Sequence, residues 1–239
     1  MRRPFRPLSA GGALGVAGGA LLLAVAVCGG AMFAYAFGSA PGHSNLLDEH
    51  VLQPFSIAFY TLFFAFLYAG VRVWKETPWR EHLALRRVPA KKLAAWIAAY
   101  LALVAAAVAL VAFGPLKAKI LRDLLQVPNS FTPATLIVFL TRFVIITPTF
   151  YEILLRGLLF RAIETSRLGA AGAIIITSLL FAAGPIAGSP WLGLCFVGVG
   201  ALLGVARWRT KSVITPWAMQ VVTYAVGLVF VCAGLRIAG

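Results

Sequence analysis

Seven long apolar runs constrain this chain more than any other feature of its sequence. Each is long enough, or nearly long enough, to cross a hydrocarbon core about 30 Å thick, for which a helix needs about 20 residues. With 61% hydrophobic and 12% charged residues, the composition lies far from that of a soluble domain. We therefore predict an all-α fold, a polytopic membrane helical bundle of about seven transmembrane helices embedded in the lipid bilayer. The predicted spans are approximately residues 10–37, 54–74, 93–114, 133–161, 169–187, 190–206 and 213–235.

The basic residues that give a net charge of +14 lie at the ends of these runs, where anionic headgroups and the positive-inside rule account for them. We therefore favour a membrane partner and predict no nucleic-acid binding. Seven spans with a cytoplasmic amino terminus put every cluster on the cytoplasmic face, and we predict an integral protein of the plasma membrane. The clusters are Arg2, Arg3 and Arg6, the loop 72–92, the stretch from Arg161 to Arg167, and Arg207, Arg209 and Lys211.

One basic segment does not fit this topology. Residues 115–131 contain "PLKAKILRDLLQV", which is a basic amphipathic stretch on the outer side of the membrane. It is either an interfacial helix or a re-entrant segment, and the second alternative would make eight membrane segments. The first apolar run, 10–37, is much longer than the core of a signal peptide, and we expect it to be an uncleaved span.

The sequence offers no clear metal or cofactor pattern. All three cysteines lie within predicted spans, where a thiol is a small apolar filler. A polar loop holds His43, Asp48, Glu49 and His50, and we expect it to be a solvated loop rather than a metal site. We predict no metal and no cofactor. The cysteines are Cys28, Cys195 and Cys232.

The span 133–161 has the clearest local logic. Thr132 and Pro133 form a typical helix start, and Pro148 predicts a kink within the run. Glu152 falls near the membrane midplane, where an ionisable group costs at least about 3 kcal/mol, which makes a functional site the default hypothesis. Arg156 lies four residues on, so a purely structural ion pair is the alternative.

Three segments, "FYEILLRGLLFRAIE", "RLGAAGAIIITSLLFAAGPI" and "SVITPWAMQVVTYAVGLV", together resemble the CPBP family of intramembrane proteases, also called CAAX prenyl endopeptidase-like or Abi proteins. The resemblance implies a core over 130–236, preceded by amino-terminal spans over 1–129, in a single integral membrane domain, 1–239. Family members carry Glu-Glu-x-x-x-Arg-Gly, Phe-x-x-x-His and His-x-x-x-Asn or Asp motifs. In the family the first Glu activates a water, and the His and Asn complete a polar, metal-binding or oxyanion-stabilising centre.

The framework of these motifs is present, but most of the reactive residues are replaced. Glu152, Arg156, Gly157 and Phe181 match the family pattern. Tyrosine is poorly suited to act as a base near neutral pH, proline offers no ligand, and glutamine is a weak ligand beside imidazole. The replaced positions are Tyr151 for the first Glu, Pro185 and Gln220 for the two His, and Tyr224 for the Asn.

These observations lead us to expect a proteolytically inactive family member that binds or scaffolds a transmembrane or prenylated segment. Two alternatives stay open: an active intramembrane endopeptidase that uses Glu152, and a small transporter or lipid-handling protein with a gated Glu152–Arg156 pair. In a purely structural alternative, the side chains of the candidate groove serve only to hold the helices together. The oligomeric state is open. The candidate groove comprises Tyr151, Glu152, Arg156, Phe181, Pro185, Gln220 and Tyr224.

Overall fold

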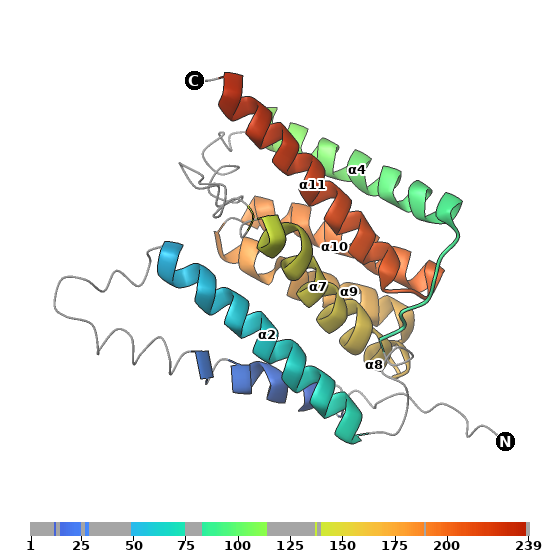
Figure 1. The fold of residues 1–239 in the computed structure, drawn as a ribbon. Coiled ribbons are helices and arrows are strands. Elements are labelled where there is room, and N and C mark those ends of the chain that lie inside the picture. The colour runs from blue at the N-terminus through green and yellow to red at the C-terminus, as the bar shows by residue number, and fades with distance from the viewer. Residues whose placement is uncertain are drawn as a thin grey trace, which may run out of the picture.

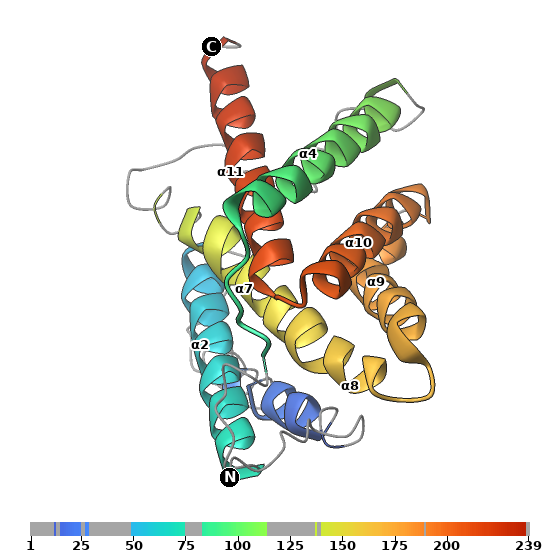
Figure 2. The ribbon, with the colours of Figure 1, turned by 90° about the vertical axis from the view of Figure 1, so that its right-hand side faces the viewer.

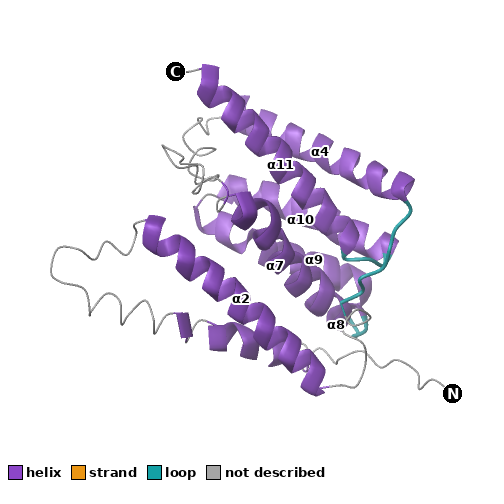
Figure 3. Cartoon of the chain, viewed as in Figure 1, coloured by secondary structure: helices purple, strands orange, loops and turns teal. Residues whose placement is uncertain are grey.

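The computed structural model describes residues 12, 15–24, 27–28, 49–74, 83–113, 137, 140–188 and 190–237. Within these residues all regular structure is helical, and no strand occurs (Figure 3). The prediction of an all-α fold is therefore confirmed. The long helices are α2 (Glu49–Trp74), α4 (Ala90–Phe113), α9 (Gly169–Gly188), α10 (Pro190–Thr210) and α11 (Ile214–Ile237).

A further helical run at the centre of the molecule alternates between two kinds of helix. It consists of the π-helix η1 (Thr141–Ile146), α7 (Thr147–Tyr151), the π-helix η2 (Glu152–Leu159) and α8 (Phe160–Glu164). Pro148 is the second residue of α7, close behind η1, and it cannot donate the backbone hydrogen bond of a regular helix. The sequence predicted the irregularity at Pro148, whereas nothing in it predicted η2. π-helical turns inside α-helices occur frequently at functional sites.

The helices pack around this central run. Helices α9 and α10 form a hairpin that lies beside α8 and η2, while α11 packs against α4 and against η1 (Figures 1 and 2). Trp217 of α11 donates a hydrogen bond from its indole nitrogen to Thr149 Oγ1 of α7, 3.0 Å away. One buried apolar cluster joins α4, η2, α9, α10 and α11. Its members include Tyr100, Leu155, Leu159, Phe181, Leu203 and Met219.

Aromatic side chains join α2 to the central run. The ring of Phe150 lies 4.6 Å from that of Phe63 and 5.2 Å from that of Tyr60, measured between centroids. Phe59 and Phe64 complete the cluster at 6.2 and 6.4 Å. Edge-to-face pairs of this kind add about 0.5–1.5 kcal/mol each beyond the area that they bury. Phe150 thus links α2 to the central run that carries the candidate site.

Apolar side chains face outward from several helices, as a lipid-exposed surface requires. Ile175, Leu179 and Leu180 of α9 and Leu194 of α10 are all exposed. Among the described residues, Ala90–Ala107 and Thr141–Glu164 are long and apolar enough to cross a membrane, and Ile57–Gly70 and Gly169–Ala183 are shorter apolar helices. The chain is an integral membrane protein, while the number of spans stays a prediction.

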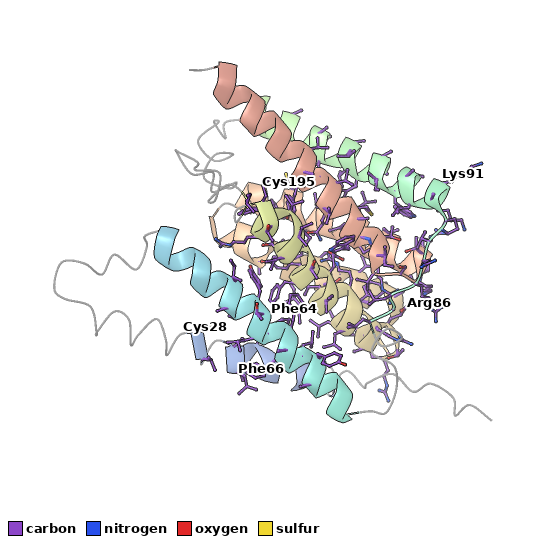
Figure 4. The ribbon with its side chains drawn as sticks, in the orientation of Figure 1. Cys28, Phe64, Phe66, Arg86, Lys91 and Cys195 are labelled. Carbon is purple, nitrogen blue, oxygen red and sulfur yellow. The ribbon has the colours of Figure 1, made fainter. Side chains whose placement is uncertain are left out.

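Several sequence predictions lie outside the described residues. These are the character of 115–131, the helix start at Thr132 and the loop with His43 and Asp48. Cys28 and Cys195 are free thiols in separate helices (Figure 4). The side chain of Cys232 is not among those described.

A close contact between two helix backbones involves a glycine of α10. A Cβ placed on Gly200 would lie 3.0 Å from the Cα atom of Ser178 in α9 and 3.2 Å from its Cβ atom. Gly198, two residues earlier in the same helix, has no atom within 4 Å of such a Cβ. Small residues permit this close approach of two backbones.

We expect Gly200→Ala to lower the free energy of unfolding by about 1–3 kcal/mol, because the backbone of α9 must shift to admit the methyl group. Gly198→Ala is the matched control and should stabilise the protein by up to about 1 kcal/mol through helix propensity. Unfolding of the purified protein in detergent measures both. Equal effects of the two replacements would show that α9 and α10 do not approach this closely.

Candidate functional site

Glu152 and Arg156 form an ion pair in the middle of the bundle. Both side chains are fully buried, and Arg156 Nη1 lies 3.3 Å from Glu152 Oε1. Both residues belong to η2, so the pair is contained within one helical segment. A buried pair requires further hydrogen bonds to offset the loss of hydration.

Partners from three other helices supply those contacts. Gln220 of α11 is fully buried, and its Nε2 donates a hydrogen bond to Glu152 Oε1. Arg156 Nη2 donates to the carbonyl oxygen of Gly200 in α10 at 3.1 Å. The guanidinium of Arg156 also lies 4.9 Å from the ring centroid of Phe181 in α9, which is a cation–π contact. The pair therefore connects η2 with α9, α10 and α11.

Tyrosine side chains surround this pair. The ring of Tyr151 lies 5.7 Å from that of Phe181, and the ring of Tyr224 lies 6.4 Å from that of Phe143. Tyr224 is within electrostatic range of Tyr151 and Glu152. The structure thus brings the predicted tyrosines from the central run and from α11 to the same place as the ion pair.

The sequence-predicted set converges with one exception. Six of its seven residues, Tyr151, Glu152, Arg156, Phe181, Gln220 and Tyr224, are linked by the contacts above. Pro185 lies in α9, one turn after Phe181, and its side chain is not among those described. Whether these residues form a working groove stays a prediction.

Two contributors were missed by the sequence analysis. Tyr100 of α4 is buried and lies within electrostatic range of Glu152, Arg156 and Tyr224. The available signal was a single phenol in the apolar stretch "WIAAYLAL". Gly200 contributes its carbonyl oxygen, and no sequence pattern announces a backbone acceptor.

The sequence did not predict that the side chain of Arg207 is buried. The sequence assigned it to a basic cluster facing headgroups, but its side chain is 2% exposed. Its Nε donates to the carbonyl oxygen of Arg156 at 3.0 Å, and its guanidinium lies 5.5 Å from the ring centroid of Phe160. An arginine at a helix end can lie either among headgroups or in the interior of the bundle. The composition of the basic cluster therefore did not distinguish these two environments.

Several polar atoms of the site have no hydrogen-bond partner among the described residues. They include Glu152 Oε2 and Gln220 Oε1, which are both acceptors. Buried polar groups are normally paired, because an unpaired group loses its hydration without compensation. These two oxygens therefore favour a ligand or water that donates hydrogen bonds.

The donors present do not fit a metal ion. Protein zinc sites use at least three nitrogen, thiolate or carboxylate ligands. Around Glu152 the described side chains offer one carboxylate, whose Oε1 already contacts Arg156 and Gln220, together with amide and phenol groups. Across the described residues no group of three His, Cys, Asp or Glu side chains gathers.

Comparison with known proteins gives one match, to a family model. Residues 133–226, less than half of the chain, match the family model described as "Type II CAAX prenyl endopeptidase Rce1-like". No curated protein and no solved structure matched the chain. The fold and the matched region define an all-α membrane protein with a protease-like core. The resemblance to the CPBP, or CAAX protease-like, family is confirmed over this region, and this part of the chain is CAAX protease-like.

A double-mutant cycle tests the ion pair. Removing one partner of a buried pair leaves an uncompensated group, so Glu152→Gln and Arg156→Gln should each cost about 3–5 kcal/mol of stability. The double replacement should cost clearly less than the sum. The half-exposed pair Lys211–Glu164 is the control, and its replacements should change stability by about 1 kcal/mol or less. Additive effects at Glu152 and Arg156 would contradict a coupled pair.

Proposed function

We propose that this protein is a non-cleaving relative of the CAAX proteases that holds a transmembrane or lipidated segment of another protein in the membrane. The main support is the state of Glu152. One of its carboxylate oxygens contacts both Arg156 and Gln220, and Tyr151 precedes it where a protease of the family has a second carboxylate. Its position at membrane depth makes a functional role the default hypothesis for such a group.

The hydrogen-bonding groups of the site support a ligand that donates hydrogen bonds. The unpartnered oxygens of Glu152 and Gln220 accept hydrogen bonds, and phenols from Tyr100 and Tyr224 lie around them. Peptide N–H groups at membrane depth need acceptors wherever a helix is interrupted. A bound segment with some free N–H groups would match this set, while its apolar side chains or lipid would contact Phe181 and the neighbouring helices.

A second candidate is an active endopeptidase in which Glu152 itself positions the attacking water. One observation favours it, because Glu152 Oε2 has no partner among the described residues and faces no competing hydrogen bond there. The other residues that the protease mechanism requires count against this candidate. Amide and phenol groups take the places of the imidazoles that the family uses, and a general base alone contributes only about 10²–10⁴-fold to a rate.

For topology, we propose the plasma membrane with the amino terminus in the cytoplasm. The proposal rests on the basic clusters at the ends of the apolar runs and on the positive-inside rule. The same orientation puts Arg209 and Lys211, at the end of α10, on the cytoplasmic side.

Binding to a panel of fluorescent membrane-anchored and prenylated peptides in nanodiscs tests the proposal. Tyr224→Phe removes one hydroxyl and keeps the ring, so we expect the Kd of a bound peptide to rise about fivefold, the equivalent of one neutral hydrogen bond. Tyr68→Phe on the exposed face of α2 is the matched control and should leave the Kd unchanged. Equal Kd values for wild type and Tyr224→Phe, or no binding by the wild type, would contradict the proposal.

A further inference from the structure

A second polar site lies at the end of the bundle where α10 meets α11. The segment between α2 and α4 crosses this end, since Val213 N donates to Ala84 O at 3.1 Å and Ser212 Oγ donates to Arg86 O at 2.5 Å. Figure 4 labels Arg86 on this segment, close to the turn after α10. Arg161 belongs to α8 and Arg207 to the last turn of α10. Three separate segments therefore bring guanidinium groups to one end of the fold.

Arg207 is the buried member of this group. Its side chain is 2% exposed, and its Nη1 has no hydrogen-bond partner among the described residues. Glu164 attracts the charge of Arg207, while Arg161 and Arg86 repel it. A buried charge is costly unless it is fully paired, so the unpartnered Nη1 atom favours a further anion.

The carboxylates near Arg207 already form ion pairs with other cations. Glu164 and Glu152 are the acidic groups of the described residues that act on Arg207. Glu164 Oε1 contacts Lys211 Nζ at 2.5 Å, and Glu152 contacts Arg156. The positive charge at this end therefore exceeds the negative charge that the described side chains supply.

From these contacts we infer a binding site for a phosphate-bearing anion, held by Arg207 together with Arg86. Guanidinium groups bind phosphate oxygens in pairs and strongly prefer such groups to neutral partners. This proposal does not depend on what the Glu152 site binds.

The surroundings favour the headgroup of an anionic lipid as the source of the phosphate. Trp208 neighbours Arg207 in the chain, and the charged ends of Arg209 and Lys211 lie 4.9 and 5.9 Å from its ring centroid. Tryptophan is enriched at the membrane interface, and basic pockets between helices at that level bind anionic headgroups. A soluble phosphate compound offers the same chemistry and is separated from a lipid by experiment.

The site also touches the ion pair in the centre of the bundle. Arg207 Nε donates to the carbonyl oxygen of Arg156, the residue that binds Glu152. An anion that fixes the Arg207 side chain would therefore fix this hydrogen bond as well. Lipid binding at the end of the bundle should accordingly stabilise the central pair.

Native mass spectrometry of the full-length protein, with phosphatidylglycerol or phosphatidylcholine of equal chain length, tests the site. We expect phosphatidylglycerol to be retained selectively, and Arg207→Gln to weaken it about tenfold, as the loss of a charge-assisted hydrogen bond predicts. Arg86→Ala should weaken it severalfold. Arg87→Ala is the matched control, because it removes the same charge from the next exposed residue, and it should change nothing.

A parallel arm adds inorganic phosphate to the protein with phosphatidylglycerol bound. Competition between inorganic phosphate and phosphatidylglycerol supports the site with a soluble source as well, and selective retention of phosphatidylglycerol alone supports a lipid source. Equal retention of the two lipids, with no effect of inorganic phosphate, would overturn the proposal. Should Arg207→Gln fail to fold, the comparison of Arg86→Ala with Arg87→Ala decides, and equal behaviour of these two variants would also overturn it.

Discussion

The buried contact between Glu152 and Arg156 is the interaction on which the rest of this bundle depends. Burying either charge alone would cost much free energy. Each charge is tolerated because the opposite charge lies four residues away in the chain. The remaining hydrogen-bonding capacity of the pair selects its neighbours, Gln220 from α11 and the Gly200 carbonyl from α10. The polar centre thus fixes which faces of the apolar helices meet. Uniformly apolar surfaces would not specify these faces.

The contacts of the ion pair continue to the end of the bundle where α10 meets α11. Arg156 uses its side chain toward Glu152 and its carbonyl oxygen toward Arg207, so two buried cations are connected through one residue. Close packing makes the connection possible, because Gly200 lets α10 approach α9 and present its carbonyl to Arg156. The end of the bundle and the central ion pair are therefore joined by a short chain of direct contacts.

The sequence predicted correctly those features that depend on a local pattern of residues. The lengths of the apolar runs located α4, α9, α10 and α11 to within a few residues, and the spacing of Glu152 and Arg156 predicted their contact. It failed where the partner comes from elsewhere in the chain. The Gly200 carbonyl and Tyr100 have no local signature, and the buried place of Arg207 follows from the packing of α8 and α10 rather than from its basic neighbours.

The most direct test of a holding rather than a cutting role is the intact mass of a membrane-anchored peptide after long incubation with the purified protein in nanodiscs. The account predicts that peptides which bind are recovered uncut. Products that gain one water at a peptide bond, formed by the wild type and absent with Glu152→Gln, would contradict it and identify Glu152 as a catalytic residue.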